Sequence, residues 1–381
     1  MVTPRNVEDY RLLAEKRLPR MVFDYLDGGA EGERGLRRNL TAFNDLCFEP
    51  RRLRDVSQRD LSIELFGRKQ PLPLVIAPTG LNGALWPEGD ILLARAAARV
   101  GIPFALSTAS TATIEHVAKQ AGGELWFQLY VVQRALAEAL TKRALAAGYK
   151  TLVLTVDVPV NGKRERDMRN GFAVPFRYSL KSVLDGAMHP RWLVRQLSNG
   201  LPELANFAGA DTKDVSAQAA LMNRQMDASF AWDDLKALRD AWPHTLLVKG
   251  LLRAEEAKQC IQLGVDGVVI SNHGARQLED TAAPVQKITE FCAEVDRPIL
   301  VDSGFRRSAD VVKAVALGAR SVLLGRATLY GLASQGEEGV SDVLRILRQE
   351  IDTTLALIGC ARIADLSPAF IQNMRSGKAN S

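Results

Sequence analysis

The 381-residue sequence has few cysteines and histidines, and neither type occurs at a spacing that binds metal. None of its four cysteines forms a C-x-x-C pair: they are Cys47, Cys260, Cys292 and Cys360. This distribution argues against a disulfide framework and favours a reducing compartment. The four histidines, at positions 116, 189, 244 and 273, lack a spacing such as H-x-x-x-H, so we expect no metal site.

Long apolar runs and long runs of one charge are also absent. No apolar stretch is long enough to span a bilayer. The first residues, MVTPRNVEDYRLLAEKR, are charged throughout and lack the apolar core of a signal peptide. The net charge is a modest +5, and Arg51, Arg52 and Arg54 lie among acidic residues. Nucleic-acid binding therefore has little support, whereas an anionic substrate or membrane surface is compatible with this charge.

The sequence does contain eight short apolar segments that are each followed by a helical pattern. They are residues 72–80, 103–108, 125–131, 151–158, 245–250, 267–270, 298–304 and 321–327. Eight such repeats predict an α/β fold, a TIM (β/α)8 barrel. An open doubly wound sheet is the alternative, but A-P-T-G follows the first strand where such a sheet would carry G-x-G-x-x-G.

We expect one domain over residues 1–381, with additions before and within the barrel. Residues 1–70 are predicted to form an N-terminal helical extension, and residues 71–158 and 231–359 the barrel. Residues 159–230 interrupt the pattern as a long insert after strand four. In the extension, the glycine pair Gly28-Gly29 is expected to end the helix that carries Tyr25. Taken alone, Tyr25 is more simply a packed amphipathic residue than a ligand.

Polar residues occur at the C-terminal ends of all eight predicted strands. They are Thr79, Ser107, Gln128, Tyr130, Thr155, Asp157, Lys249, His273, Asp302 and Arg326. The carboxyl ends of barrel strands all meet on one rim, where barrel enzymes build their sites. The pattern therefore predicts an active site on this rim.

The segment from Ser271 to Asp280, S-N-H-G-A-R-Q-L-E-D, carries the most informative pair of this set. His273 and Arg276 leave the sixth strand together. Arginine binds a carboxylate in a bidentate fork, and histidine can take a proton near neutral pH. An isolated pair would be read as a capping turn with two solvated side chains. The polar residues at the ends of the seven other strands favour instead an active site, one that binds an acid with a reacting hydroxyl.

The loops after the last two strands suggest a phosphate-containing cofactor. D-S-G-F-R-R (302–307) and L-G-R (324–326) offer glycines and arginines where barrels usually hold phosphate. Lys249 has two interpretations, a Schiff-base lysine of a barrel aldolase or a cation beside a flavin. The neutral hydrogen-bonding residues Ser107, Gln128 and Thr155 favour the flavin. A barrel without activity that binds only phosphate ligands or membrane is a third possibility.

Seven motifs together resemble one family along nearly the whole chain. They are A-P-T-G, W-F-Q-L-Y, L-T-V-D, L-V-K-G, S-N-H-G-A-R-Q-L, D-S-G-F-R-R and L-L-G-R. The chain resembles the FMN-dependent 2-hydroxy-acid oxidising enzymes, which implies FMN as the cofactor. One departure is Ala275, where the family carries glycine. If this position needs a positive φ, the added methyl could displace the loop and Arg276.

The resemblance also implies roles for individual residues. His273 would be the catalytic base, Asp157 would stabilise its protonated form, Tyr130 would assist at the hydroxyl, and Arg276 would bind the carboxylate. The substrate-binding set implied is Tyr25, Gly80, Ala109, Tyr130, Arg164, His273 and Arg276. The FMN-binding set implied is Pro78, Thr79, Gly80, Ser107, Gln128, Thr155, Lys249, Ser271, Asp302, Ser303, Gly304, Arg306, Gly325 and Arg326.

Within the family, several stretches look most like the (S)-mandelate dehydrogenases. They include V-E-D-Y-R, P-T-G-L-N-G-A-L-W-P and G-R-A-T-L-Y-G-L-A. Ala109 stands where glycolate-oxidising members carry a bulky aromatic residue, which would leave room for a phenyl group. Gly80 stands where the oxidases have alanine. We therefore expect oxidation of (S)-mandelate to benzoylformate, with (S)-lactate or another 2-hydroxy acid as the alternative substrate.

The insert mixes aromatic and basic residues: Phe172, Phe176, Arg177, Tyr178, Lys181, Arg191, Trp192 and Arg195. This composition fits a peripheral membrane contact, an active-site lid or a subunit contact equally well. The resemblance to membrane-associated members favours membrane contact through residues 171–215 and a quinone or another electron-transport acceptor. It further implies a homotetramer, on the cytoplasmic side of a bacterial inner membrane or otherwise cytoplasmic.

Overall fold

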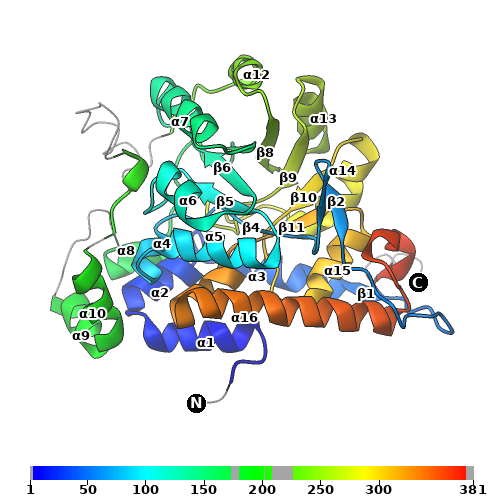
Figure 1. The fold of residues 1–381 in the computed structure, drawn as a ribbon, viewed down its shortest axis with the longest axis horizontal. Coiled ribbons are helices and arrows are strands. Elements are labelled where there is room, and N and C mark those ends of the chain that lie inside the picture. The colour runs from blue at the N-terminus through cyan, green and yellow to red at the C-terminus, as the bar shows by residue number, and fades with distance from the viewer. Residues whose placement is uncertain (1–2, 173–179, 201, 208–225, 375–381) are drawn as a thin grey trace.

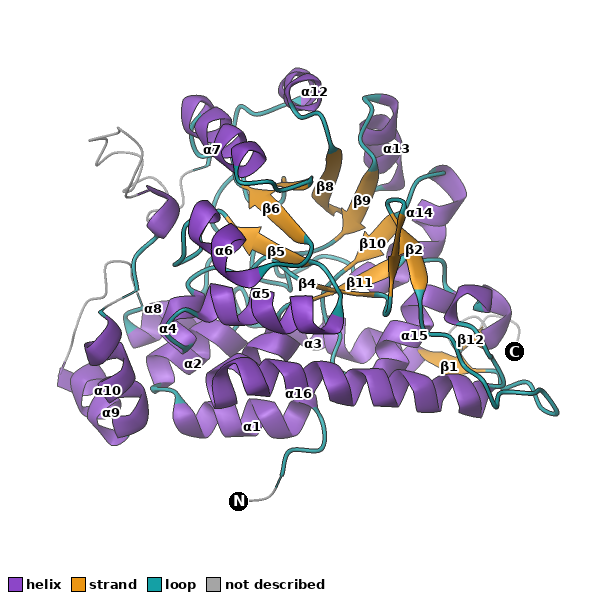
Figure 2. Ribbon diagram, viewed as in Figure 1, coloured by secondary structure: helices purple, strands orange, loops and turns teal. Residues whose placement is uncertain are grey.

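The computed structural model describes residues 3–172, 180–200, 202–207 and 226–374, with side chains omitted for 180–182. Its centre is a closed barrel of eight parallel strands (Figure 2). The strands are β4 (Leu74–Ile76), β5 (Phe104–Ser107), β6 (Leu125–Leu129), β7 (Thr151–Thr155), β8 (Thr245–Leu251), β9 (Gly267–Ile270), β10 (Ile299–Val301) and β11 (Ser321–Leu324). They pair in sequence order, and β11 closes on β4, so the predicted TIM barrel is confirmed.

The strands are shorter than the predicted segments, because several polar rim residues lie in the loops that follow. Thr79, Asp157 and Asp302 all come after the last residue of their strands. Strand β8 differs, since it continues past Lys249 to Leu251 through an irregularity in its pairing with β9. Gly250 has φ +108° at this point, and a Cβ there would lie 2.7 Å from Asp157. Only glycine therefore allows β8 to pass this close to Asp157.

Helices surround the barrel (Figure 1). They are α5 (Gly89–Val100), α6 (Ile114–Ala121), α7 (Arg134–Ala146), α12 (Trp232–Ala241), α13 (Ala254–Gln262), α14 (Ile288–Glu294), α15 (Ser308–Ala316) and α16 (Arg326–Ile358). The long α16 packs against α1 and α5 and has a kink at Gln335 and Gly336. The indole of Trp86 lies against this kink, since a Cβ on Gly336 would lie 2.9 Å from it.

The N-terminal extension is helical through Asp45 and then continues in short strands. It contains α1 (Val7–Arg17), α2 (Arg20–Asp27), α3 (Arg34–Thr41) and the 3-10 turn η1 (Ala42–Asp45). As expected, α2 ends at Gly28. Strand β1 (Leu46–Phe48) then pairs with β12 (Ile371–Asn373), and β2 (Ile63–Leu65) with β3 (Arg68–Gln70). Outside the extension and the insert, the described chain forms the 3-10 turns η3 (Pro284–Lys287), η4 (Ile363–Asp365) and η5 (Pro368–Phe370).

The β2–β3 hairpin covers the amino end of the barrel. Its turn residues Phe66 and Gly67 both have positive φ, as a two-residue hairpin requires. The Phe66 ring packs edge-on against Trp126, at 6.1 Å between centroids, and a Cβ on Gly267 would lie 3.1 Å from it. Trp126 and Gly267 stand at the starts of β6 and β9, so the opposite, carboxyl end of the barrel is the one available for a site.

The insert begins with α8 (Glu165–Asn170) and continues with α9 (Leu180–Met188), α10 (Pro190–Asn199) and η2 (Ala205–Phe207). Phe176, Arg177 and Tyr178 lie outside the described residues. Figure 1 shows α9 and α10 at one edge of the molecule, beside α1, α2 and α4 (Asn82–Leu85). The indole of Trp192 donates to Ala84 O at 2.8 Å, and the Gln196 amide donates to Gly83 O at 2.8 Å. No helix in the described part of the chain is long and apolar enough to cross a membrane.

Candidate active site

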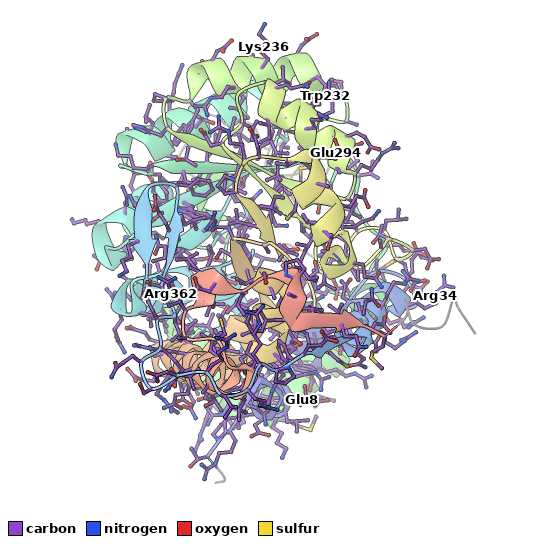
Figure 3. All side chains as sticks on the ribbon, turned by 90° about the vertical axis from the view of Figure 1, so that its right-hand side faces the viewer. Glu8, Arg34, Trp232, Lys236, Glu294 and Arg362 are labelled. Carbon is purple, nitrogen blue, oxygen red and sulfur yellow. The ribbon has the colours of Figure 1, made fainter. Side chains whose placement is uncertain are left out.

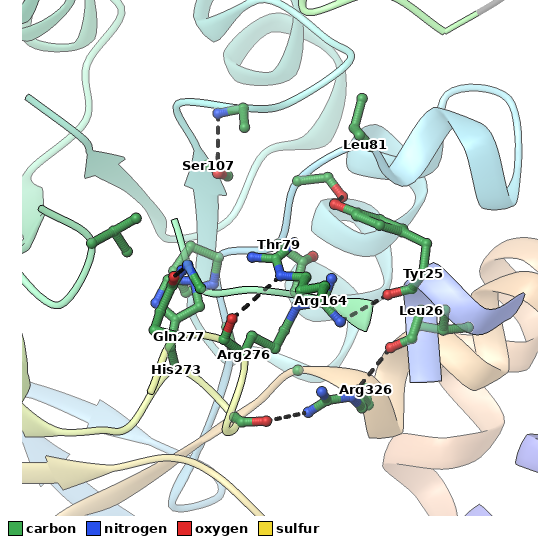
Figure 4. Close-up of a pocket in the computed structure, with 18 of the residues that line it drawn as sticks. Tyr25, Leu26, Thr79, Leu81, Ser107, Arg164, His273, Arg276, Gln277 and Arg326 are labelled. Carbon is green, nitrogen blue, oxygen red and sulfur yellow. Dashed lines mark hydrogen bonds between the residues drawn. The ribbon is translucent and has the colours of Figure 1, made fainter. Parts of the chain in front are cut away.

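A cavity of about 800 Å³ lies at the carboxyl end of the barrel, a size that suits a cofactor together with a small substrate (Figure 4). Most of the residues predicted from the sequence line it: Tyr25, Pro78, Thr79, Gly80, Ser107, Ala109, Tyr130, Arg164, Lys249, His273, Arg276, Asp302, Ser303, Gly304, Arg306, Gly325 and Arg326. The other four stand directly behind a lining residue. Gln128 bonds to Ser107, Asp157 to His273 and Ser271 to Lys249, while Thr155 pairs with Lys249 in the sheet.

His273, Asp157 and Tyr130 form a hydrogen-bonded triad in the cavity. The Nδ1 of His273 lies 2.8 Å from Asp157 Oδ1, and its Nε2 lies 3.1 Å from the Tyr130 hydroxyl. Burial lowers the pKa of His273, and the Asp157 carboxylate partly offsets this by favouring the imidazolium. Burial opposes ionisation of Asp157, but His273 and Lys249 outweigh it and lower the carboxyl pKa. The imidazole is thus neutral at rest, with an ionised partner that stabilises it once it takes a proton.

An unusual loop presents His273 to the cavity, because three consecutive residues have positive φ. The angles are +58° for His273, +65° for Gly274 and +58° for Ala275. The amide of His273 donates to Ser271 Oγ and that of Gly274 to Ser303 Oγ, both at 3.0 Å. Position 275 therefore does have the left-handed conformation that favours glycine. Its amide nevertheless donates to the Asn272 side chain at 3.1 Å, and Arg276 still lines the cavity.

Lys249 is a buried cation held between two acceptors. Its Nζ donates to Ser271 Oγ at 2.9 Å and forms an ion pair with Asp302 Oδ2 at 3.0 Å. Burial opposes its charge, but Asp302 and Asp157 outweigh burial and raise the pKa above its usual range. A Schiff-base lysine needs a neutral amine as nucleophile. This environment therefore disfavours the aldolase interpretation and suits a permanent cation beside an electron-rich ring.

Two arginines of the cavity are held by the C-terminal end of α2. Arg276 Nη1 donates to the carbonyls of Tyr25 and Gly28, each at 2.8 Å. Arg326 donates to Leu26 O at 3.2 Å, as Figure 4 shows, and also to Gly28 O at 2.6 Å. Cations are stabilised at a helix C-terminus, where the last carbonyls lack partners. Burial and the nearby charge of Arg276 lower the pKa of Arg326 to about 10, so two positive charges share a region suited to anions.

A buried carboxylate that the sequence interpretation missed fixes this end of α2. Asp27 accepts from Arg11 Nε at 2.8 Å, from Arg166 Nη1 at 3.0 Å and from the Tyr330 hydroxyl at 2.7 Å. These partners come from α1, α8 and α16. No local motif marks them, because they are far apart in the sequence and only the fold brings them together.

The cavity also contains apolar residues that the sequence interpretation did not place there. The Phe172 ring stacks on Tyr25, with centroids 4.3 Å apart and planes 12° from parallel. Sequence composition had placed Phe172 among the aromatics of a membrane contact or lid. Tyr25 itself is both packed and exposed to the cavity. Further unpredicted lining residues include Leu26, Leu81, Leu85, Asn161, Asp167, Met168, Leu204, Met226 and Gln277.

The residues present fit an FMN. Gln128 Nε2 and Thr155 Oγ1 are buried polar atoms without a hydrogen-bond partner in the described chain, so both can bind the polar edge of an isoalloxazine. Lys249 provides the cation on the same rim. Ser303, Gly304, Arg306, Gly325 and Arg326, from the loops expected to hold phosphate, also line the cavity. A Cβ at Gly325 would meet no atom closer than 3.9 Å, which leaves open space above its backbone.

Comparisons with known proteins agree with this geometry. A family model described as FMN-dependent dehydrogenase matches residues 14–373. The chain is 58% identical to (S)-mandelate dehydrogenase of Pseudomonas putida over 368 residues, 97% of this chain and 94% of that protein. It is 40% identical to an L-lactate dehydrogenase of Vibrio cholerae over 366 residues, 94% of this chain and 96% of that protein.

Solved structures give the same result. A crystal structure of the monotopic membrane protein (S)-mandelate dehydrogenase superposes with a TM-score of 0.95 at 57% identity, and the match covers 98% of this chain and all of that one. A mandelate oxidase structure with benzoyl-formic acid superposes with a TM-score of 0.82 at 33% identity, covering 97% and 98%. The family model spans nearly the whole chain, and both relatives match its full architecture. The chain therefore belongs to the FMN-dependent dehydrogenase family.

Proposed function

We propose that this FMN-dependent enzyme oxidises (S)-mandelate to benzoylformate. The observation that carries the proposal is the composition of the cavity around His273. A base paired with Asp157 stands beside arginines, and Leu81, Phe172, Leu204 and Met226 supply an apolar region. The small side chain of Ala109 lies against Gly80, since a Cβ on Gly80 would lie 3.0 Å from it. Arginines for a carboxylate, a base and an apolar region are what an aryl 2-hydroxy acid requires.

In this proposal, the arginines bind and orient the carboxylate. The α2 carbonyls occupy Nη1 of Arg276, and no described residue bonds its Nε or Nη2, so these atoms can receive a carboxylate. Arg164 is buried beside it and donates from Nε to Arg276 O at 3.3 Å. Tyr25, packed between Phe172 and the guanidinium of Arg276, limits the space at the carboxylate end.

His273 moves the proton in the proposed reaction. Its Nε2 takes a proton from the substrate, whether from the hydroxyl or from the α-carbon, and Tyr130 shares the same region through its hydroxyl. In either case the imidazole becomes positive, and Asp157 stabilises that charge at 2.8 Å. A bound FMN would supply the two-electron acceptor that oxidation at the α-carbon needs. Lys249 keeps a positive charge on the rim where negative charge would develop.

An anaerobic visible spectrum of the holoenzyme tests this proposal. We expect the flavin band to bleach rapidly after addition of (S)-mandelate and slowly after addition of (S)-lactate. The lactate dehydrogenases among the relatives make lactate the second candidate. If lactate bleaches the band and mandelate does not, the proposed reaction stands but its substrate is lactate. A protein that binds no FMN at all would contradict the whole proposal.

We further propose that the enzyme contacts a membrane peripherally and passes its electrons to a quinone. Five large apolar side chains of α9 and α10 are mostly exposed: Val183 (54%), Leu184 (65%), Met188 (73%), Val194 (61%) and Leu197 (71%). Exposed apolar residues on two helices that pack together are typical of an interaction surface. Flotation with vesicles tests the contact, and anaerobic reduction of a soluble quinone analogue by mandelate tests the acceptor. If the protein does not float with the vesicles, the membrane contact is refuted. If the quinone analogue is not reduced, the proposed acceptor is refuted.

The homotetramer and the cytoplasmic face of a bacterial inner membrane stay predictions from the family resemblance. Light scattering of the detergent-solubilised protein measures the first. Protease protection of the enzyme in sealed membrane vesicles of known orientation measures the second.

A further inference from the structure

Helix α3 of the N-terminal extension packs directly on the loop that carries His273, residues 271–276, which we call the catalytic loop. Figure 3 shows Arg34, the first residue of α3, at the surface of the molecule. Its backbone amide and its Nε both donate to the Glu279 side chain at 2.8 Å. A Cβ on Gly35 would lie 2.3 Å from Glu279 O and 3.2 Å from the Cβ of Ala275, so only glycine allows this contact. The helix is therefore fixed against the catalytic loop and the residues that follow it.

Five residues after Arg34, the buried Asn39 forms a reciprocal amide pair with Asn272 of the catalytic loop. Asn39 Nδ2 donates to Asn272 Oδ1 at 2.9 Å, and Asn272 Nδ2 donates to Asn39 Oδ1 at 2.8 Å. The Asn272 side chain also accepts from the Ala275 amide at 3.1 Å and donates to Ala282 O at 3.2 Å. These last two bonds fix which atom of the Asn272 amide is the oxygen, and all four of its hydrogen-bonding positions are used.

The catalytic loop needs such support, because its backbone conformation is unfavourable. His273 and Ala275 both have φ +58°, a conformation that residues other than glycine rarely adopt. Such a conformation persists only where the surrounding structure imposes it. Ser271 Oγ binds the His273 amide at the start of the loop, and Asn272 Oδ1 binds the Ala275 amide at its end. The second of these acceptors is held in place by Asn39.

We propose that Asn39 is a positioning residue for catalysis, whose amide holds the Asn272 side chain so that the catalytic loop places His273 Nε2 at the substrate proton. This rests on the role proposed above for His273. Arg276, at the end of the loop, is held separately by the α2 carbonyls. Loss of the amide pair is therefore expected to affect kcat more than the binding of the substrate carboxylate.

The substitutions N39A and N39D test the pair in the full-length holoenzyme. N39A removes it at every pH. In N39D the new carboxyl group keeps both hydrogen bonds while it is neutral, because its hydroxyl donates and its other oxygen accepts. Once ionised, it has no proton to donate to Asn272 Oδ1. Burial and these hydrogen bonds both favour the neutral form and raise the pKa of such a carboxyl, so lower pH restores the pair.

We expect N39A to lower kcat with mandelate roughly 10- to 100-fold, since a catalytic group displaced by about 1 Å can cost this much. The KM should change less than about three-fold. N39D should show a similar loss at high pH. The ratio of its kcat to the wild-type kcat should then rise as the pH falls, whereas the ratio for N39A should stay flat. The wild-type amides do not titrate, so the rise in this ratio reports the restored pair.

N206D is the matched control, since Asn206 is also a fully buried asparagine. Its Oδ1 accepts from the Ile114 amide at 3.0 Å, and Arg143 Nη2 lies 3.5 Å from the same oxygen. The arginine keeps the new carboxyl of N206D ionised, so we expect its kcat ratio to wild type not to rise at low pH. A rise equal to that of N39D would make acid recovery a general effect of this substitution and refute the proposal.

A crystal structure of N39A gives a readout that does not depend on turnover. In the wild-type structure His273 Nε2 lies 3.1 Å from the Tyr130 hydroxyl. We expect this distance to increase by about 1 Å or more in N39A, with Ala275 outside the left-handed region. If N39A does not fold, a structure of N39D above and below the pH of its recovery replaces it.

The remaining outcomes separate a positioning role from a structural one and from failure of the proposed function. A catalytic loop that is unchanged in N39A, or a flat kcat ratio for N39D, would show that the proposal is wrong. If N39A lowers the thermal midpoint but keeps its kcat per bound flavin, Asn39 only stabilises the fold and the proposal is refuted. If neither mandelate nor lactate bleaches the wild-type flavin, the proposed function fails, and the N39A structure still decides whether Asn39 holds the loop.

Discussion

Replacing Asp157 with asparagine tests whether the catalytic base depends on its buried partner. The variant keeps the shape of the side chain, which packs directly against Gly250, and removes its charge. Asp157 is bonded to His273 at 2.8 Å. A hydrogen bond to a charged group contributes about 1.5–3 kcal/mol. If that stabilisation is present only when the imidazole is protonated, D157N should lower kcat/KM roughly 10- to 150-fold.

The pH dependence of kcat/KM provides a second, independent test. Burial already lowers the pKa of His273, and Asp157 is the main group that raises it again. Without Asp157 the pKa falls further, so the imidazole stays neutral to lower pH. Because the neutral form is the active base, the acidic limb of kcat/KM should move to lower pH while the plateau falls. A structural defect would lower the plateau without moving the limb.

A double-mutant cycle with His273 completes this test. In an H273Q background, D157N should have almost no further effect on turnover, because its partner is already gone. The flavin absorbance and the thermal midpoint of each variant serve as controls for folding and cofactor binding. An unchanged acidic limb together with an additive loss in the double variant would refute the coupling of Asp157 to His273.

Three further predictions follow from the cavity and its loop. H273Q alone should retain the yellow flavin absorbance and lose turnover with mandelate, and retained turnover would remove His273 as the base. A109F should lower kcat/KM for mandelate by roughly 30- to 150-fold, because loss of the phenyl-binding site costs about 2–3 kcal/mol. Lactate has no phenyl group, so its turnover should change less than about three-fold. Equal losses with both substrates would show that the phenyl group binds elsewhere. A275G should leave the free energy of unfolding within about 0.5 kcal/mol of the wild-type value. Glycine relieves the left-handed strain at this position (about 1–2 kcal/mol), but it also raises the entropy of the unfolded chain and loses the packing of the methyl group. Urea denaturation measures this, and a loss above about 2 kcal/mol would contradict that balance.

The sequence by itself determined the barrel and the set of side chains at its rim. Each strand is a short apolar run followed by a helical period, and both patterns are local properties of the chain. Because all strands of such a barrel run parallel, residues just past their ends must meet on one rim, which is how His273, Asp157 and Lys249 could be assigned to one site. The glycine-containing loops after β10 and β11 could be recognised for the same reason.

Tertiary structure alone decided how these residues are held and what else surrounds them. The α2 carbonyls that bind Arg276 and Arg326, the Asp27 carboxylate that fixes α2, and the stacking of Phe172 on Tyr25 all join segments far apart in the chain. No periodicity or motif encodes such contacts, because they depend on how the extension and the insert pack against the barrel. The sequence therefore specified the reactive groups, and the packing specified their orientation, their charge and the surface beside them.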